Sequence, residues 1–153
     1  MISSDYEDLF STLNAHKIKY LVVGAHAVMF YTQPRYTKDV DVLIPAALND
    51  PQRVYGALKA FGAPLRGIAP EDFQNPEMFL QIGVAPVRID ILVDLKGISV
   101  QEAWKHRKRS RYGKTPINLL GLAELIEAKK ATGRPQDALD LAKLRARMRK
   151  KPR

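Results

Sequence analysis

The stretch TKDVDVLI, residues 37–44, has the alternating pattern of a β-strand and carries two acidic residues. Because side chains point alternately to the two faces of a strand, Val40, Val42 and Ile44 share one face, and Asp39 and Asp41 share the other. Aspartate is among the residues that strands disfavour. The stretch therefore predicts a strand with one apolar packing face, whose opposite face is either a solvated surface or half of a cation site.

Strands and helices alternate on both sides of this stretch. The segment YLVVG (20–24) is a short apolar run ending in glycine, which predicts a buried strand, and residues 25–32 have the character of a helix that ends before Pro34. We expect further helices that begin at Ser4, Ser99 and residue 134, and helices over residues 51–61 and 121–133. We also expect a hairpin of two strands, at 78–83 and 87–95, and weak strand candidates within 109–120.

This order of elements predicts a single domain over residues 1–153, with a basic tail at about 146–153. The expected fold class is α/β (α+β). Its mixed β-sheet would have helices packed mainly on one face and a helical pair at the C-terminal end.

The last predicted helix carries acidic and apolar residues, for which we expect different roles. Asp137 and Asp140 are three residues apart and share one helix face, so we expect them to pair with Arg134 or with the preceding helix rather than to bind a ligand. The apolar side chains that we expect to face the core are those of Leu139, Ala142 and Leu144.

The composition limits the kinds of site that the chain can build. It has no cysteine, which excludes disulfides and thiolate metal sites and agrees with a reducing compartment. The first residues, MISSDYEDLF, carry acids where a secretory signal needs positive charge, and no segment approaches the roughly 18 apolar residues of a membrane span. We therefore expect a cytoplasmic protein with no membrane partner.

Positive charge is concentrated in the last third of the chain. The formal net charge is +9, but residues 1–104 hold 9 Lys and Arg against 12 Asp and Glu, whereas residues 105–153 hold 16 against 4. Two clusters, at 105–114 and 143–153, supply most of this charge. Such clusters favour polyanions such as nucleotides or RNA, although a solvated helix face with a frayed tail explains the last few residues equally well.

A third acidic residue, Asp90, lies in the predicted strand VRIDIL. If this strand pairs beside residues 37–44, Asp90 reaches the face that carries Asp39 and Asp41. Carboxylates about 4 Å apart repel each other by roughly 4 kcal/mol per pair at an effective dielectric constant near 20, so three together require a cation. Oxygen ligands select hard ions, and we therefore expect Mg²⁺ (or Mn²⁺) at Asp39, Asp41 and Asp90, bridging to substrate phosphates.

The turn from strand to helix at Gly24 and Ala25 is a candidate phosphate site. Glycine lets another group approach the backbone, and the free N–H groups at a helix start attract anions. The basic residues expected to neutralise a triphosphate are Arg35 and Lys38, just before the acidic pair, and Lys129 and Arg134, on and after the penultimate helix.

Two parts of the chain carry a resemblance to a known family. VVGAHAVMFYTQPRYTKDVDVLI, with Asp90 in RIDIL, resembles the minimal nucleotidyltransferases related to DNA polymerase β, whose signature is a strand ending in Gly-Gly or Gly-Ser, a helix, Asp-x-Asp and a later third Asp. PRYTKDVDV and LIEAKKATGRPQDALDL are most similar to the small bacterial proteins grouped with toxins of the AbiEii type. The similarity spans residues 20 to about 144.

The resemblance implies specific roles for the residues that match the family signature. The three aspartates would hold the metal ions, Gly24 and Ala25 would meet the triphosphate, and Lys129 would help to bind it. Ala25 departs from the signature, which favours Gly or Ser at this position. Alanine keeps the backbone N–H group but offers no hydroxyl group to a phosphate.

The expected function is metal-dependent nucleotidyl transfer from a nucleoside triphosphate (NTP) to an acceptor. The acceptor would be an RNA 3′ end, a protein hydroxyl group or a small molecule, and the resemblance adds a link to toxin–antitoxin pairs. The alternative is a non-catalytic domain of the same fold that binds nucleic acid or protein through its basic segments. Because 153 residues leave little room for an acceptor domain, we expect a partner protein or a second copy of the chain to contribute.

Overall fold

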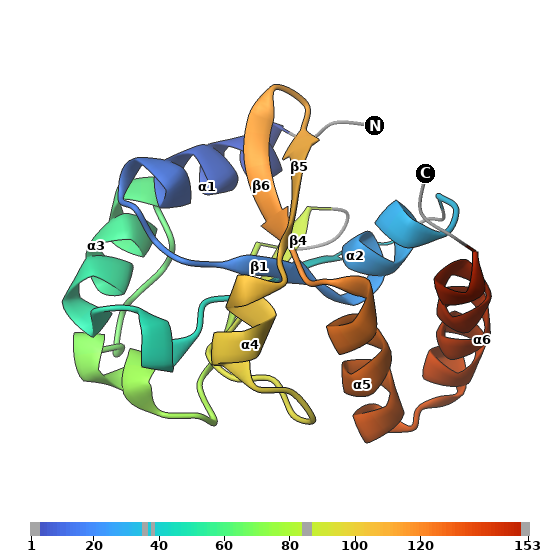
Figure 1. Ribbon diagram of the computed structural model, residues 1–153. Helices are drawn as coiled ribbons and strands as arrows, with labels where there is room; N and C mark the ends of the chain where they lie inside the picture. The colour runs from blue at the N-terminus through green and yellow to red at the C-terminus, as the bar shows by residue number, and fades with distance from the viewer. Residues whose placement is uncertain (1–3, 35–36, 38, 84–86, 151–153) are drawn as a thin grey trace.

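The computed structural model describes residues 4–34, 37, 39–83 and 87–150. Within them a six-stranded sheet has the order β3-β4-β2-β1-β6-β5. The strands are β1 (Leu21–Val23), β2 (Asp39–Leu43), β3 (Phe79–Ile82), β4 (Arg88–Leu92), β5 (Lys108–Tyr112) and β6 (Thr115–Leu119). The α-helices are α1 (Ser4–Ala15), α2 (Gly24–Tyr31), α3 (Pro51–Phe61), α4 (Val100–Lys105), α5 (Leu122–Thr132) and α6 (Pro135–Arg149), with 3-10 turns at Ala46–Leu48 and Pro70–Gln74. In Figure 1, α1 and α3 lie on the left of β1, and α5 and α6 lie on the right.

The sheet is mixed, as the order of elements predicts. β2 lies at its centre, antiparallel to β1 and parallel to β4. The predicted hairpin of β3 and β4 is confirmed as an antiparallel pair, while its turn at 84–86 lies outside the described residues. The weak strand candidates form a second hairpin, β5 and β6, whose strand β6 runs parallel to β1.

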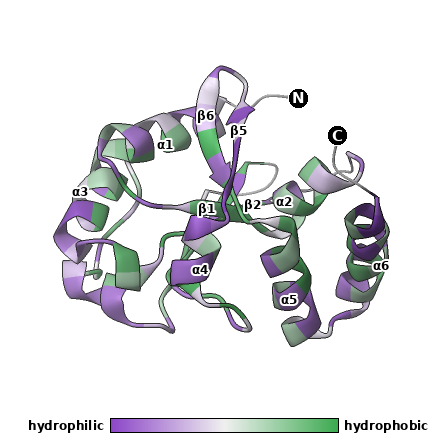
Figure 2. Ribbon diagram, in the orientation of Figure 1, coloured by the Kyte–Doolittle hydropathy of each residue, from purple (hydrophilic) through white to green (hydrophobic). Residues whose placement is uncertain are grey.

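Apolar side chains pack on both faces of this sheet. On one face, Val40 and Val42 of β2 join a cluster built with α1 and α3. On the other face, Leu43 joins a second cluster built with α2, α4, α5 and α6. The helices are therefore spread over both faces, more widely than the sequence predicts, because β1 is apolar on both faces and Leu43 extends the apolar surface of the second face. Figure 2 shows the corresponding mixture of hydrophilic and hydrophobic residues along α1 and α3.

The C-terminal helical pair, α5 and α6, is confirmed, but the buried face of α6 differs from the predicted one. Leu144 is buried as expected, whereas Leu139 is 61% exposed and Ala142 is exposed. The positions that turn inward are Asp137 and Asp140. They do so because a lysine of α5 meets their carboxylates there, and this ion pairing fixes the rotation of the helix. None of the described helices is both long and apolar enough to cross a membrane.

Candidate functional site

The register of β2 and β4 brings the three predicted acidic residues to one face of the sheet. Asp41 lies directly opposite Asp90 in the parallel pair, and Asp39, two residues before Asp41, lies opposite Arg88. Because opposite residues of paired strands point to the same face, all three carboxylates lie on the side covered by α5. We call Asp39, Asp41 and Asp90 the cleft acids.

Two polar neighbours of the cleft acids were not identified as site residues from the sequence. Arg88 donates a hydrogen bond from Nη2 to Asp39 Oδ2 at 2.7 Å, and its Nε lies 3.9 Å from Asp90 Oδ1. Gln81 of β3 donates from Nε2 to Asp90 Oδ1 at 3.2 Å. The alternation of β4 already places Arg88 on the face of Asp90, but the role of Gln81 depends on the pairing of β3 with β4.

The neighbouring basic residues do not fully neutralise the negative charge of the cleft acids. The pKa of Asp41 is raised from its usual value to about 7, first because the carboxyl group is buried, and then because Asp90 and Asp39 are negatively charged neighbours. A hydrogen bond with Asp90 acts in the same direction, while the positive charge of Lys129 lowers the pKa. Burial and the neighbouring carboxylates therefore disfavour the ionised form of Asp41, and a nearby cation would favour it.

Gly24 has a different structural role from the one that its sequence position suggests. Its φ is +66°, a conformation that glycine adopts easily, and a Cβ atom at this position would overlap the Asp41 carboxylate. The missing side chain thus makes room for Asp41 directly beside the start of α2. No side chain caps this helix start, and its first N–H groups remain available to an anion.

A cleft of about 500 Å³ opens over these residues. The cleft acids, Arg88 and Gln81 line its floor, and Leu92, Leu95 and Leu125 contribute apolar wall. The half-exposed ring of Phe79 lies at the edge of the sheet. A volume of this size fits a nucleotide or a drug-sized molecule.

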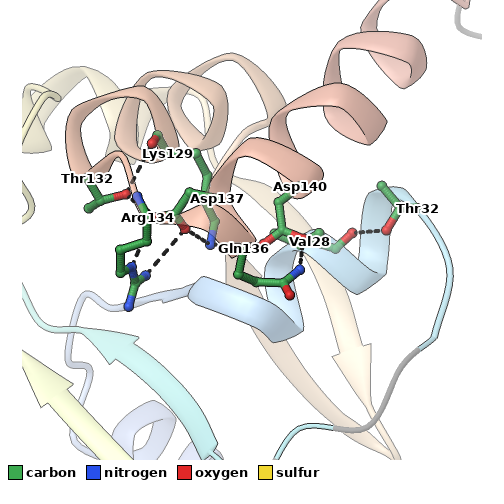
Figure 3. A network of polar contacts seen from close by, with 8 residues as sticks. All are labelled: Val28, Thr32, Lys129, Thr132, Arg134, Gln136, Asp137 and Asp140. Atoms are coloured by element: carbon green, nitrogen blue, oxygen red, sulfur yellow. Dashed lines mark hydrogen bonds and ion pairs between the residues drawn. The ribbon is translucent and has the colours of Figure 1, made fainter.

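Lys129 and Arg134 also line the cleft, but both are engaged by the acids of α6 (Figure 3). Lys129 is only 8% exposed, and its Nζ lies 3.1 Å from Asp137 Oδ1 and 3.2 Å from Asp140 Oδ2. Arg134 donates from Nε to Asp137 Oδ2 at 2.9 Å, while its side chain stays 70% exposed. The expected pairing of Asp137 and Asp140 is thus confirmed. We call these four residues the α5–α6 network.

The remaining predicted phosphate ligands are placed only in part. Ala25 is half-buried in the first turn of α2, next to Gly24. Arg35 and Lys38 lie outside the described residues.

The donor set of the cleft acids fits a hard divalent ion, although Arg88 holds one of the three. Asp39 Oδ1 is buried and has no hydrogen-bond partner within the described part of the chain, and Asp41 and Asp90 offer oxygen ligands side by side. In the described residues, no three acidic, histidine or cysteine side chains already have an arrangement that could hold a metal ion. Asp41 and Asp90 suit a first ligand pair, and Asp39 offers its Oδ1 to the same ion while Arg88 holds its Oδ2.

No protein-family model and no curated protein sequence matches the chain. Solved structures do. The lincosamide antibiotic adenylyltransferase LnuA, with bound lincomycin, is similar over 95% of this chain and 98% of its own, at 14% identity and a TM-score of 0.60. A candidate nucleotidyltransferase from Thermotoga maritima matches over 95% and 96%, at 17% identity and a TM-score of 0.59.

An antigenic nucleotidyltransferase-like protein from Paracoccidioides brasiliensis matches over 96% of this chain and 77% of its own, at 15% identity and a TM-score of 0.57. The chain therefore has the nucleotidyltransferase fold. The narrower likeness to the AbiEii type remains a prediction from the sequence.

Proposed function

We propose that the protein is a metal-dependent nucleotidyltransferase that moves a nucleoside monophosphate from an NTP to an acceptor hydroxyl group. The observation that carries this proposal is the pairing of Asp41 with Asp90 in a nucleotide-sized cleft, where their charge is incompletely neutralised. The fold shared with nucleotidyltransferases supports it. Perturbed carboxylates in a cleft are typical of functional sites, because a purely structural role would select full neutralisation.

Each residue of the site has a part in this proposal. Mg²⁺ or Mn²⁺ held by the cleft acids would stabilise the negative charge that develops on the α-phosphate. Asp90 would accept the proton of the acceptor hydroxyl, whose oxygen forms the new bond to the α-phosphorus as the bond to pyrophosphate breaks. The N–H groups at Gly24 and Ala25 would bind the triphosphate.

The two basic residues over the cleft, Lys129 and Arg134, would have different roles. Arg134 keeps most of its side chain exposed and would contact the phosphates directly. Lys129 is held by Asp137 and Asp140 and would act mainly as a fixed positive charge beside Asp41.

The acceptor would be an RNA 3′ end, a protein hydroxyl group or a small molecule. Lincomycin bound to LnuA illustrates the small-molecule case for that protein. A further structural neighbour, ANT(2″)-Ia (TM-score 0.53), is also an antibiotic-resistance factor. A place in a toxin–antitoxin pair of the bacterial cytoplasm, with a partner protein or a second copy of the chain, is proposed from the sequence resemblance alone.

Transfer of label from α-labelled NTPs in the presence of Mg²⁺ and cell extract tests the proposed function and identifies the acceptor. Replacing Asp41→Asn should reduce labelling by about 10³-fold or more, since a metal ion contributes several kcal/mol to such a transition state. Asp94→Asn is the matched control, because Asp94 follows β4 but is exposed and does not line the cleft. Equal labelling by wild type and Asp41→Asn would refute the proposal.

A further inference from the structure

A second hollow, of about 310 Å³, lies beside β5, at the opposite edge of the sheet from β3 and β4. Its lining contains two arginines, one tryptophan and several neutral polar side chains, and no acidic residue. The residues that matter for its chemistry are Asn14, Trp104, Arg107, Arg109, Ser110 and Asn118. None of them belongs to the cleft.

Arg107 is held in place at this hollow by contacts with Trp104. Its guanidinium carbon lies 4.0 Å from the centre of the Trp104 ring, and Nη1 donates to the Trp104 carbonyl oxygen at 2.8 Å. Its Nε is buried and has no hydrogen-bond partner among the described residues. Burial, and then the positive charge of Arg109, lower the pKa of Arg107. Two neighbouring cations, one of them partly desolvated, favour an anion between them.

The positive charge continues along β5, which Figure 2 shows as hydrophilic. Arg109 and Arg111 are two residues apart in the strand, so their side chains leave the same face at a spacing of about 6.7 Å. In the described part of the chain neither forms an ion pair, whereas Lys105 and His106, just before them, meet Glu102 and Glu124. A row of uncompensated cations suits a ligand with repeated negative charges better than a single anion.

Charges on an edge strand also protect a sheet from pairing with another copy. This role accounts for exposed residues such as Lys108 and Arg111. It does not account for a half-buried arginine that stacks on tryptophan with an unsatisfied Nε, because a solvated side chain would protect the edge at a lower desolvation cost.

We propose that this hollow binds a phosphate group of a single-stranded nucleic acid whose backbone follows β5. Arg107 and Arg109 would contact the phosphate, and the Asn118 amide would contribute a neutral hydrogen bond. The Asn14 amide, which donates to the Pro116 carbonyl oxygen and accepts from the Tyr20 hydroxyl, forms part of the wall. We call Trp104, Arg107 and Arg109 the β5 phosphate site. Binding here does not depend on the proposed transfer reaction, since the two sites share no residue.

Trp104 is the only tryptophan of the chain, so its fluorescence reports directly on this hollow. Titration of the full-length protein with a short single-stranded oligonucleotide should change the fluorescence emission of Trp104 until the site is saturated. The apparent affinity should fall steeply with salt. The double variant Arg107→Gln/Arg109→Gln should weaken binding by about 100-fold and lower the salt slope by about 1 to 2.

Matched variants separate this site from general electrostatics. Lys59→Gln/Arg66→Gln removes the same charge at exposed positions of α3 and the following loop, and should change the affinity by less than about threefold. Asp41→Asn should bind the oligonucleotide as wild type does, even if it transfers no nucleotide. Thermal unfolding checks that each variant is folded.

Three results would overturn the proposal. One is an oligonucleotide titration that leaves Trp104 emission unchanged. The second is an equal loss of affinity in both double variants. The third is inorganic phosphate binding as tightly as the oligonucleotide, which would reduce the site to one for a single anion.

Discussion

The cleft acids and the α5–α6 network both contain buried or half-buried carboxylates, and residues of both line one cleft, but their charges are balanced differently. In the network, Asp137 and Asp140 meet Lys129, and Arg134 adds a second cation. Among the described residues, Arg88 is the ion-pair partner of Asp39 and Asp90, and Asp41 forms no ion pair. The pKa values follow this difference.

The pKa of Asp137 lies well below its usual range, because hydrogen bonds from Arg134, Thr132 and Lys129 outweigh the burial of its carboxyl group. The pKa of Asp41 is raised to about 7. Selection for stability alone favours neutralised charges. The incomplete neutralisation of the cleft acids is therefore the feature that supports the proposed cation site.

The largest expected effect on stability is the loss of a network carboxylate. Asp137→Asn leaves the buried Lys129 with one anionic partner and should lower the free energy of unfolding by about 3 to 5 kcal/mol. Urea denaturation at pH 7 measures this change. Glu127→Gln removes the exposed ion pair with Lys130 on the same helix, α5, and should cost less than about 1 kcal/mol. Similar losses in both variants would show that the network is not structural.

Removing a cleft acid should raise the free energy of unfolding, whereas removing a network acid lowers it. In the absence of divalent ions, Asp41→Asn should raise the free energy of unfolding at pH 8 by about 2 to 4 kcal/mol, because it removes the ionised carboxylate that the folded state disfavours. Urea denaturation in the presence of a chelator measures it. Addition of Mg²⁺ should stabilise wild type and not the variant.

The gain in the free energy of unfolding of Asp41→Asn should increase with pH. An acid whose folded pKa is raised, as for Asp41, destabilises the fold increasingly as pH rises from about 4, the unfolded value, to about 7. The difference between Asp41→Asn and wild type should therefore vanish near pH 4 and reach its maximum above pH 7. For Asp137 the folded pKa is lowered, so its contribution is present above about pH 4 and is lost as pH falls further. A gain from Asp41→Asn that is constant with pH would contradict this account.

The smallest expected effect concerns Arg88, the basic side chain that pairs with Asp39 in the cleft. Arg88→Met frees Asp39 and leaves the cleft more negative, so Mn²⁺ should bind about tenfold more tightly, as measured by calorimetry. Arg66→Met makes the same charge change at an exposed loop position and should leave the affinity unaltered. Weaker Mn²⁺ binding by Arg88→Met would mean that Arg88 positions Asp39 for the ion instead of competing with it.

Much of the fold could be predicted because its signals are local. Helix α3 begins and ends where Pro51 and Gly62 predict, and the period-two pattern of residues 37–44 identifies β2 and its acidic face. The parallel pairing of β2 with β4 was only a condition in the sequence argument. Once that pairing is present, its register places Asp90 beside Asp41.

The errors lie where distant residues decide the outcome. Leu139 was expected inside, yet it is exposed because Lys129 of the other helix turns Asp137 and Asp140 inward. Gly24 was expected to admit another backbone, and instead its missing side chain makes room for the Asp41 carboxylate. Its expected contact with a triphosphate stays a prediction.

Side-chain alternation and chain breakers act within a few residues, so the amino-acid sequence was enough to identify the elements, the apolar face of β2 and the three aspartates. Which charges meet, Arg88 with Asp39 and Lys129 with the acids of α6, followed from the folded arrangement alone. Coulomb energies and desolvation depend on distances between segments far apart in the chain, and these distances exist only once the sheet and the helical pair have formed.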